Sequence, residues 1–129
     1  MGFQIKAVQA LDLWRGAIVE SVRRDGPDLS ARQMALLLTV YLTPPPHTVR
    51  GLATSLNVSK PAITRALDRL SELGLIKRKT DDQDRRSVLV QRTVKGSVFL
   101  REFGDLIVVA SREACSDESA SQEESAPVA

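Results

Sequence analysis

The stretch from Thr48 to Lys95 reads TVRGLATSLNVSKPAITRALDRLSELGLIKRKTDDQDRRSVLVQRTVK. Its order is a short helix, an Asn turn, a basic helix that ends at a Gly, and two basic strands around a polar tip. A chain with this pattern builds a helix-turn-helix followed by a β-hairpin wing, which is suited to gripping duplex DNA. The sequence therefore predicts a mainly α (α+β) winged helix-turn-helix with about five helices and a two-stranded β wing.

Capping residues mark the helices of this stretch. Thr48 is expected to cap its first, short helix, and Asn57 suits a left-handed turn residue. Ser59 is expected to cap the next helix, over residues 60–73. Gly74 then suits the position just past a helix end, where a positive φ is common. These signals predict two helices joined by a tight turn.

The end of the stretch has strand character. Residues 75–79 partly alternate, residues 87–92 contain a β-branched run, and the segment 81–86 between them is a polar tip longer than a two-residue turn. Thr93 can cap a further helix, whose apolar content continues to about residue 110. A hairpin followed by a helix is therefore expected.

Two more helices are expected before this stretch. Apolar residues recur at helical spacing over about residues 4–24. Ser30 and Gln33 form a capping-box pattern that opens a second helix, which is apolar nearly all round and therefore expected to be buried. Prolines at 44–46 prevent its continuation.

Charge is unevenly distributed along the chain. The formal net charge is +2, yet residues 1–110 hold 17 basic and 11 acidic side chains, and residues 59–95 hold ten basic and five acidic ones. Clustered basic charge is the electrostatic footprint of a polyanion binder. A well-solvated surface is the ordinary alternative for such a cluster when it stands alone.

The composition is that of a globular protein. Its 129 residues, 43% hydrophobic and 26% charged, suffice for one domain with a proper core. We expect this domain over residues 1–112, with terminal helices for dimerisation, and an acidic, Ser-rich disordered tail over 113–129. The sequence has no run of 18 apolar residues, no signal-peptide pattern and a single Cys, which favours a cytoplasmic protein. That Cys115 has acidic neighbours, which disfavour a redox-sensing thiolate.

The basic helix after Ser59 has one apolar stripe and one polar face. The residues expected to face inward are Ile63, Ala66, Leu67 and Leu70. The opposite face is suited to a major groove, and the positive end of the helix dipole favours phosphate. The candidate DNA-binding residues of this helix are Ser59, Lys60, Pro61, Thr64, Arg65 and Arg69.

Two of these side chains can read bases. Thr64 can touch base edges or a thymine methyl, and Arg65 can take guanine bidentately. The alternative is that the arginines pair inside the protein with Asp68 or Glu72. For Arg69 this bracing role is the favoured one, whereas groove insertion is favoured for the helix as a whole.

The hairpin tip supplies a second group of candidates. Asp84 stands two residues before Arg86, where its carboxylate can fix the direction of the guanidinium. An Arg at a hairpin tip fits the narrow, electronegative minor groove of A·T-rich DNA. The side chains expected to contact phosphates are Lys77, Arg78, Lys79, Arg85 and Arg92. The alternative is a solvated, charged turn.

Together these motifs resemble the winged helix-turn-helix regulators of the multiple-antibiotic-resistance (MarR) family. The resemblance covers roughly residues 29–103 and rests on RGLA at 50–53, NVSKPAITR at 57–65, LSELGLI at 70–76, DRRS at 84–87 and TVKG at 93–96. It implies a homodimer that binds a palindromic site and often represses transcription. It also implies a recognition helix at 59–73 and a wing Arg at Arg86, supported by Asp84. Family members usually have a longer C-terminal region, and the short fifth helix expected here departs from that pattern.

The residues thus predict a sequence-specific, double-stranded-DNA-binding transcription regulator, and the resemblance implies that it is of repressor type and acts as a homodimer. The alternative is a winged-helix module that docks a protein partner, although protein interface cores are depleted in Lys. An enzyme is the least supported interpretation, because the sequence has no nucleophile–base pair, metal cluster or phosphate-cradling Gly loop. We expect no metal and no cofactor. No residue cluster identifies a small-molecule effector.

Overall fold

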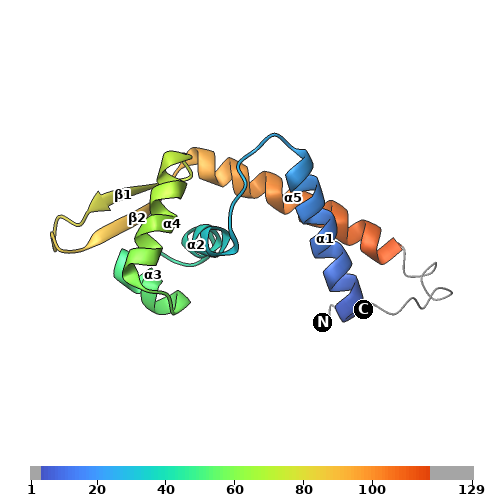
Figure 1. Ribbon diagram of the computed structural model, residues 1–129, viewed down its shortest axis with the longest axis horizontal. Coiled ribbons are helices and arrows are strands. Elements are labelled where there is room, and N and C mark those ends of the chain that lie inside the picture. Colours follow the sequence, from blue (N-terminus) through green and yellow to red (C-terminus); the bar gives the residue numbers. More distant parts are fainter. Residues whose placement is uncertain (1–3, 117–129) are drawn as a thin grey trace. The chain divides into compact units, whose positions relative to one another are not determined.

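Two compact units make up the described part of the chain: residues 27–100 form one, and residues 4–26 with 101–116 form the other. The computed structural model describes residues 4–116. These residues form five helices and one two-stranded antiparallel sheet, as predicted (Figure 1). Most of the tail expected over 113–129 lies outside the described residues.

The elements follow one another in the predicted order. They are α1 (Ala7–Arg23), α2 (Ala31–Leu42), α3 (Val49–Leu56), α4 (Lys60–Glu72), β1 (Ile76–Thr80), β2 (Val88–Arg92) and α5 (Val94–Ser116). The last helix is longer than expected, because it continues beyond residue 110. The other bounds lie within a few residues of the predicted ones.

The helix-turn-helix is built by local hydrogen bonds. The hydroxyl of Thr48 accepts the Gly51 N–H at 2.9 Å, and the hydroxyl of Ser59 accepts the Ala62 N–H at 3.3 Å. Each satisfies a donor that the first turn of a helix would otherwise leave unpaired. Between the two helices Asn57 has φ 53° and ψ 48°, the left-handed conformation expected of it.

The hairpin begins after a glycine turn. Gly74 has φ +75°, which only Gly adopts without strain. The two strands then pair from Ile76 opposite Arg92 to Thr80 opposite Val88. The hairpin extends beyond α3 and α4 (Figure 1).

The core of the unit 27–100 joins all its elements. Its most deeply buried large side chains are Leu36, Leu37, Val40, Ile63, Leu67, Leu70 and Leu75. The inward stripe predicted for α4 is therefore confirmed. The burial expected of α2 holds for Leu36, Leu37 and Val40, whereas Leu42 at its end is 76% exposed. Only one face of α2 meets the core.

A tyrosine hydroxyl fastens the base of the hairpin. The Tyr41 hydroxyl donates to the Leu75 carbonyl at 2.6 Å and accepts the Thr93 N–H at 2.8 Å. Leu75 directly precedes β1 and Thr93 directly follows β2. The same hydroxyl and the Leu75 carbonyl lie so close to Gly96 that a Cβ there would overlap both. One side chain of α2 thus holds both ends of the hairpin and the first turn of α5.

The other unit packs α1 against the later part of α5. The ring of Trp14 meets that of Phe103 edge-on, with centroids 6.1 Å apart. Farther along the two helices Gly16 lies against Ala110, where an added Cβ would stand 3.2 Å from the alanine methyl. A small residue at this crossing allows the two helices to approach closely.

Candidate nucleic-acid interface

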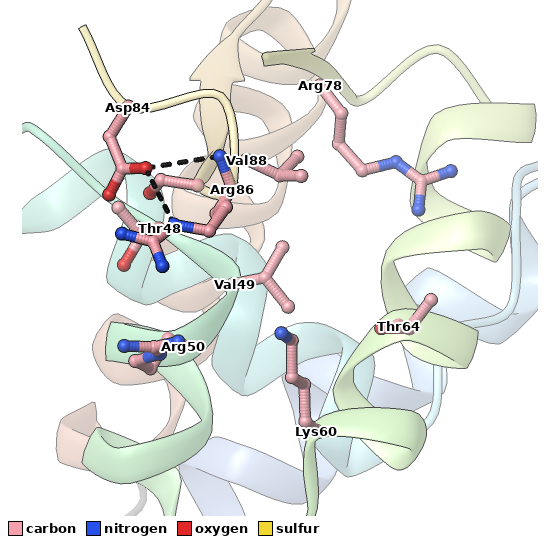
Figure 2. A pocket seen from close by; sticks show the side chains of 10 residues that line it. Thr48, Val49, Arg50, Lys60, Thr64, Arg78, Asp84, Arg86 and Val88 are labelled. Carbon is pink, nitrogen blue, oxygen red and sulfur yellow. Dashed lines mark hydrogen bonds and ion pairs between the residues drawn. The ribbon is translucent and has the colours of Figure 1, made fainter. Parts of the chain in front are cut away.

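A hollow of about 320 Å³ lies between the start of α3, the start of α4 and the hairpin. Its lining residues are Thr48, Val49, Arg50, Lys60, Thr64, Arg78, Asp84, Arg86, Ser87 and Val88. In the view of Figure 2, Arg50 and Asp84 lie on one side of the hollow, and Lys60 and Thr64 lie on the other. Side chains of the predicted recognition helix and of the predicted wing therefore share one surface.

The buried stripe of α4 turns its candidate residues outward. Lys60 is exposed and Thr64 is half-buried, and both line the hollow. Arg65 is also exposed, but it lies outside the hollow. Ser59 and Pro61 are exposed in the first turn, where the Ser59 hydroxyl is already engaged as the helix cap. The accessible side-chain donors of this turn therefore begin with Lys60.

Arg69 takes part in a contact within its own helix. Its guanidinium stands 3.9 Å from the carboxylate of Glu72, one turn further on. The two side chains are 47% and 70% exposed, so this ion pair adds little to stability. The bracing contact favoured for Arg69 is present, and Arg69 does not line the hollow.

The strand β1 divides its cations between two faces. Successive side chains of a strand point to opposite sides, so Lys77 and Lys79 face away from Arg78. Arg78 lines the hollow and lies 2.8 Å from the carboxylate of Asp68 on α4. Lys79 lies 4.0 Å from Asp82. Both lysines are exposed and neither lines the hollow.

The hairpin tip is shaped by a carboxylate. Asp84 accepts the backbone N–H of Arg86 at 3.1 Å, and the same oxygen lies 3.6 Å from the Arg86 Nε (Figure 2). The Asp81 N–H bonds to the Ser87 carbonyl at 2.9 Å, which closes the tip. The Arg86 side chain is nevertheless 94% exposed. The contact with Asp84 is thus the one by which this carboxylate was expected to orient the guanidinium. The neighbouring Arg85 is exposed and lies outside the hollow.

Arg92, which was expected to contact phosphate, is engaged within the protein. Its guanidinium donates to the Val40 carbonyl at 2.9 Å and to the Thr43 carbonyl at 3.0 Å. It also lies over the Tyr41 ring, 5.8 Å from the centroid. Arg92 therefore braces the end of α2. The basic pattern of the strand could not reveal these acceptors, because they lie about fifty residues earlier in the sequence.

Arg50 also lines the hollow, although it was not among the residues predicted for the site. Val49 and Leu52 are buried, so helical geometry leaves Arg50 exposed in the first turn of α3. The cap at Thr48 and the spacing of these apolar residues were the sequence features from which the exposure of Arg50 could have been predicted. The short helix thus contributes a cation as well as packing.

Two further features bear on the class of protein. Within residues 4–116, no group of three His, Cys, Asp or Glu side chains is arranged to hold a metal ion. Across that same range, no helix combines the length and hydropathy that crossing a membrane requires.

Comparison with known proteins agrees with this architecture. Residues 29–88 match the model of the MarR family. The transcriptional regulator BldR from Sulfolobus solfataricus is 29% identical, with a TM-score of 0.59 over 92% of this chain and 91% of its own. A structure of MarR is 25% identical, with a TM-score of 0.57 over 92% and 77%. A mutant of MepR from S. aureus shares the fold with a TM-score of 0.72 at 18% identity, over 93% and 90%.

The matched segment contains α3, α4 and the hairpin tip, which together line the hollow. The similar structures cover nearly the whole chain, and one of them, BldR, is a transcriptional regulator. Residues 29–88 of this protein therefore match the MarR family, and the chain has the winged-helix fold of MarR-type structures.

Proposed function

We propose that this protein is a sequence-specific, double-stranded-DNA-binding transcription regulator of repressor type. The observation that supports it best is the shared hollow: Lys60 and Thr64 of α4 line it together with Arg86 of the tip. Two cationic segments that project onto one surface can engage adjacent grooves of a duplex. A DNA-binding protein can repress transcription simply by occupying a promoter. In this proposal the protein acts in the cytoplasm, where it meets the DNA.

In this proposal α4 enters the major groove. Thr64 and Arg65 follow the first turn of the helix, and the side chains that anchor α4 in the core point the other way. Arg65 is exposed and long enough to take the O6 and N7 of guanine as a bidentate donor. Thr64 reads a neighbouring base edge or a thymine methyl. These two residues carry the sequence preference.

The wing follows the minor groove. Arg86 is 94% exposed, yet the Asp84 oxygen 3.6 Å from its Nε limits its rotamers before binding. A preordered side chain loses less conformational entropy when it is immobilised. The narrow minor groove of A·T-rich DNA concentrates negative potential and attracts an Arg inserted into it. Lys77, Lys79 and Arg85 contact phosphates, which position the protein without specifying a sequence.

A homodimer is part of the proposal, because the unit of α1 and the later part of α5 leaves apolar side chains in solvent. The exposed ones on α1 are Val8, Leu11, Trp14, Ile18 and Val22, and those on α5 include Val108 and Val109. Those on α1 recur at helical spacing and form a stripe. A stripe of this kind marks an interaction surface. A second copy that covers it would set two recognition helices on half-sites about 34 Å apart.

The test is binding to DNA selected from random duplexes. We expect recovered sequences to share a palindromic motif. The logarithm of the binding constant should fall linearly with the logarithm of salt concentration, with a slope of about −0.9 for each phosphate neutralised. If no motif is enriched and the affinity for duplex does not change between about 50 and 200 mM salt, a range over which a protein with several phosphate contacts binds much more weakly, the proposal is wrong. A protein-docking role would then account better for the surface.

A further inference from the structure

The cations of the hollow are of two electrostatic kinds. Arg78 is paired with Asp68 at 2.8 Å, and Arg86 is paired with Asp84 at 3.6 Å. Arg50 and Lys60 line the same hollow. Neither of them has an ion-pair partner among residues 4–116. The hollow therefore holds two cations whose charge the described part of the protein leaves uncompensated.

Packing fixes where these two cations stand. Arg50 is the second residue of α3, between the buried Val49 and Leu52, so its side chain must leave the core. Lys60 is the first residue of α4, whose orientation is set by the buried Ile63. The two helices are joined by the left-handed turn at residue 57. Unlike a pair of neighbouring surface residues, the two charges are brought to one hollow by the fold.

The backbone donors at this place are partly used up. The Thr48 hydroxyl accepts one N–H of the α3 start, and the Ser59 hydroxyl accepts one of the α4 start. A ligand that enters the hollow therefore meets chiefly side-chain donors. Arg50 offers a planar guanidinium and Lys60 a compact ammonium, and both groups suit the oxygens of a phosphate.

We infer that Arg50 and Lys60 form a phosphate-binding pair that holds one phosphodiester of the DNA backbone in this hollow. The inference rests on the proposed function and adds a residue and a subsite to it. Because the strand between the two grooves has to pass the space between α4 and the tip, the hollow lies where a phosphate of that strand would stand. The carboxylates paired with Arg78 and Arg86 orient these two side chains, whereas Arg50 and Lys60, which have no ion-pair partner among the described residues, supply the net positive charge of the hollow.

This division predicts different salt responses. Neutralising one phosphate releases counterions and contributes about −0.9 to the slope of log K against log salt. Arg50→Gln should make that slope less steep by up to about 0.9, and so should Lys60→Gln. Arg78→Gln should change it less, because the Arg78 guanidinium is engaged by Asp68 at 2.8 Å and is not one of the two groups that hold this phosphate. Arg32→Gln is a matched control, since Arg32 is exposed in the same unit but lies outside the hollow.

The experiment is a salt titration of these variants on a duplex selected by the wild-type protein, with thermal melts to verify folding. Arg50→Lys keeps the point charge and should restore the wild-type slope. A scan with single methylphosphonates, which remove one phosphate charge at a time, gives a second readout. One position should weaken the wild type markedly and weaken Arg50→Gln less, because only Lys60 still holds that phosphate in the variant.

The outcomes separate the two proposals. If wild-type protein binds steeply with salt but Arg50→Gln has the wild-type slope, or no methylphosphonate position distinguishes the two, the phosphate pair is refuted and the DNA-binding function stands. If wild-type binding itself lacks salt dependence, the proposed function fails. If Arg50→Gln does not fold, Lys60→Gln and the same methylphosphonate scan decide the inference.

Discussion

The guanidinium of Arg78 lies 2.8 Å from the carboxylate of Asp68, which ties the first strand of the hairpin to the outward face of α4. The two side chains are 30% and 51% exposed, so solvent screens the pair and its contribution to folding is small. Its importance is geometric. It couples the direction of the predicted wing to the direction of the predicted recognition helix.

Breaking this pair should have non-additive effects. Asp68→Asn and Arg78→Gln each remove the same interaction, so the double variant should lose less unfolding free energy than the sum of the singles, by about 0.5 kcal/mol. Urea unfolding of all four proteins measures this coupling. Strict additivity, both in unfolding and in duplex affinity, would show that the two elements are oriented independently of the pair.

Arg65→Ala should relax sequence choice. Loss of a bidentate contact to guanine costs about 1–3 kcal/mol at that base pair and makes its substitution tolerable. Competition assays with single-base variants of the selected duplex measure the effect. Arg69→Ala is the control from the same helix, because Arg69 already stands 3.9 Å from Glu72. Equal discrimination by the wild type and Arg65→Ala would assign base reading to another residue.

Arg86→Ala should weaken binding most where the sites are flanked by A·T pairs. The narrow groove there rewards an inserted guanidinium, whereas G·C flanks do not. Arg85→Ala should instead lower affinity about equally for both flanks, because phosphate contacts ignore sequence. Titrations of paired duplexes that differ only in their flanks test both variants. A flank-independent loss with Arg86→Ala would contradict minor-groove insertion.

Two glycines of α5 should respond oppositely to alanine. In Gly96→Ala the new Cβ would overlap the Tyr41 hydroxyl and the Leu75 carbonyl, so we expect a loss of about 1–3 kcal/mol or more of unfolding free energy. At Gly104 nothing lies within 4 Å of the added atom, and alanine should stabilise the helix by up to about 1 kcal/mol. Chemical denaturation compares the two. Similar stabilities would mean that the first turn of α5 is not held by α2.

Leu11→Glu should weaken self-association. Leu11 is 62% exposed in the apolar stripe of α1, and a charge buried there in a dimer would be unpaired and desolvated. Light scattering over a range of protein concentrations should detect a dimer of the wild type and a shift toward monomer for the variant. Ala10→Glu places the same charge on an exposed position outside the stripe and should leave the mass unchanged. A monomeric wild type would remove the dimer from the proposal.

The sequence predicted best what depends on neighbours along the chain. The capping box of Ser30 and Gln33 is present, with its two hydrogen bonds of 2.9 and 3.1 Å. Asn57 and Gly74 have the positive φ angles that their positions suggested. Each of these features is formed within a few residues, so a local pattern contains the information that specifies it.

The sequence predicted less well what depends on distant partners. Arg92 looked like one more strand cation, but its acceptors are carbonyls about fifty residues earlier in the chain. The pairing of Arg78 with Asp68 needed the packing of a strand on a helix. Arg50 became a candidate only when α3, α4 and the tip were seen to line one hollow. The chemistry of single residues does not show which of them the fold brings together.

The hydroxyl of Tyr41 fastens the backbone just before β1 and just after β2, so the two roots of the hairpin are clamped at one point. Residues 81–86 are remote from that clamp and have no member in the buried core. The length and charge of the tip can therefore change between descendants of this protein while the packing of the core stays the same. Divergence in the DNA flanks that such relatives prefer should therefore accumulate at the tip first.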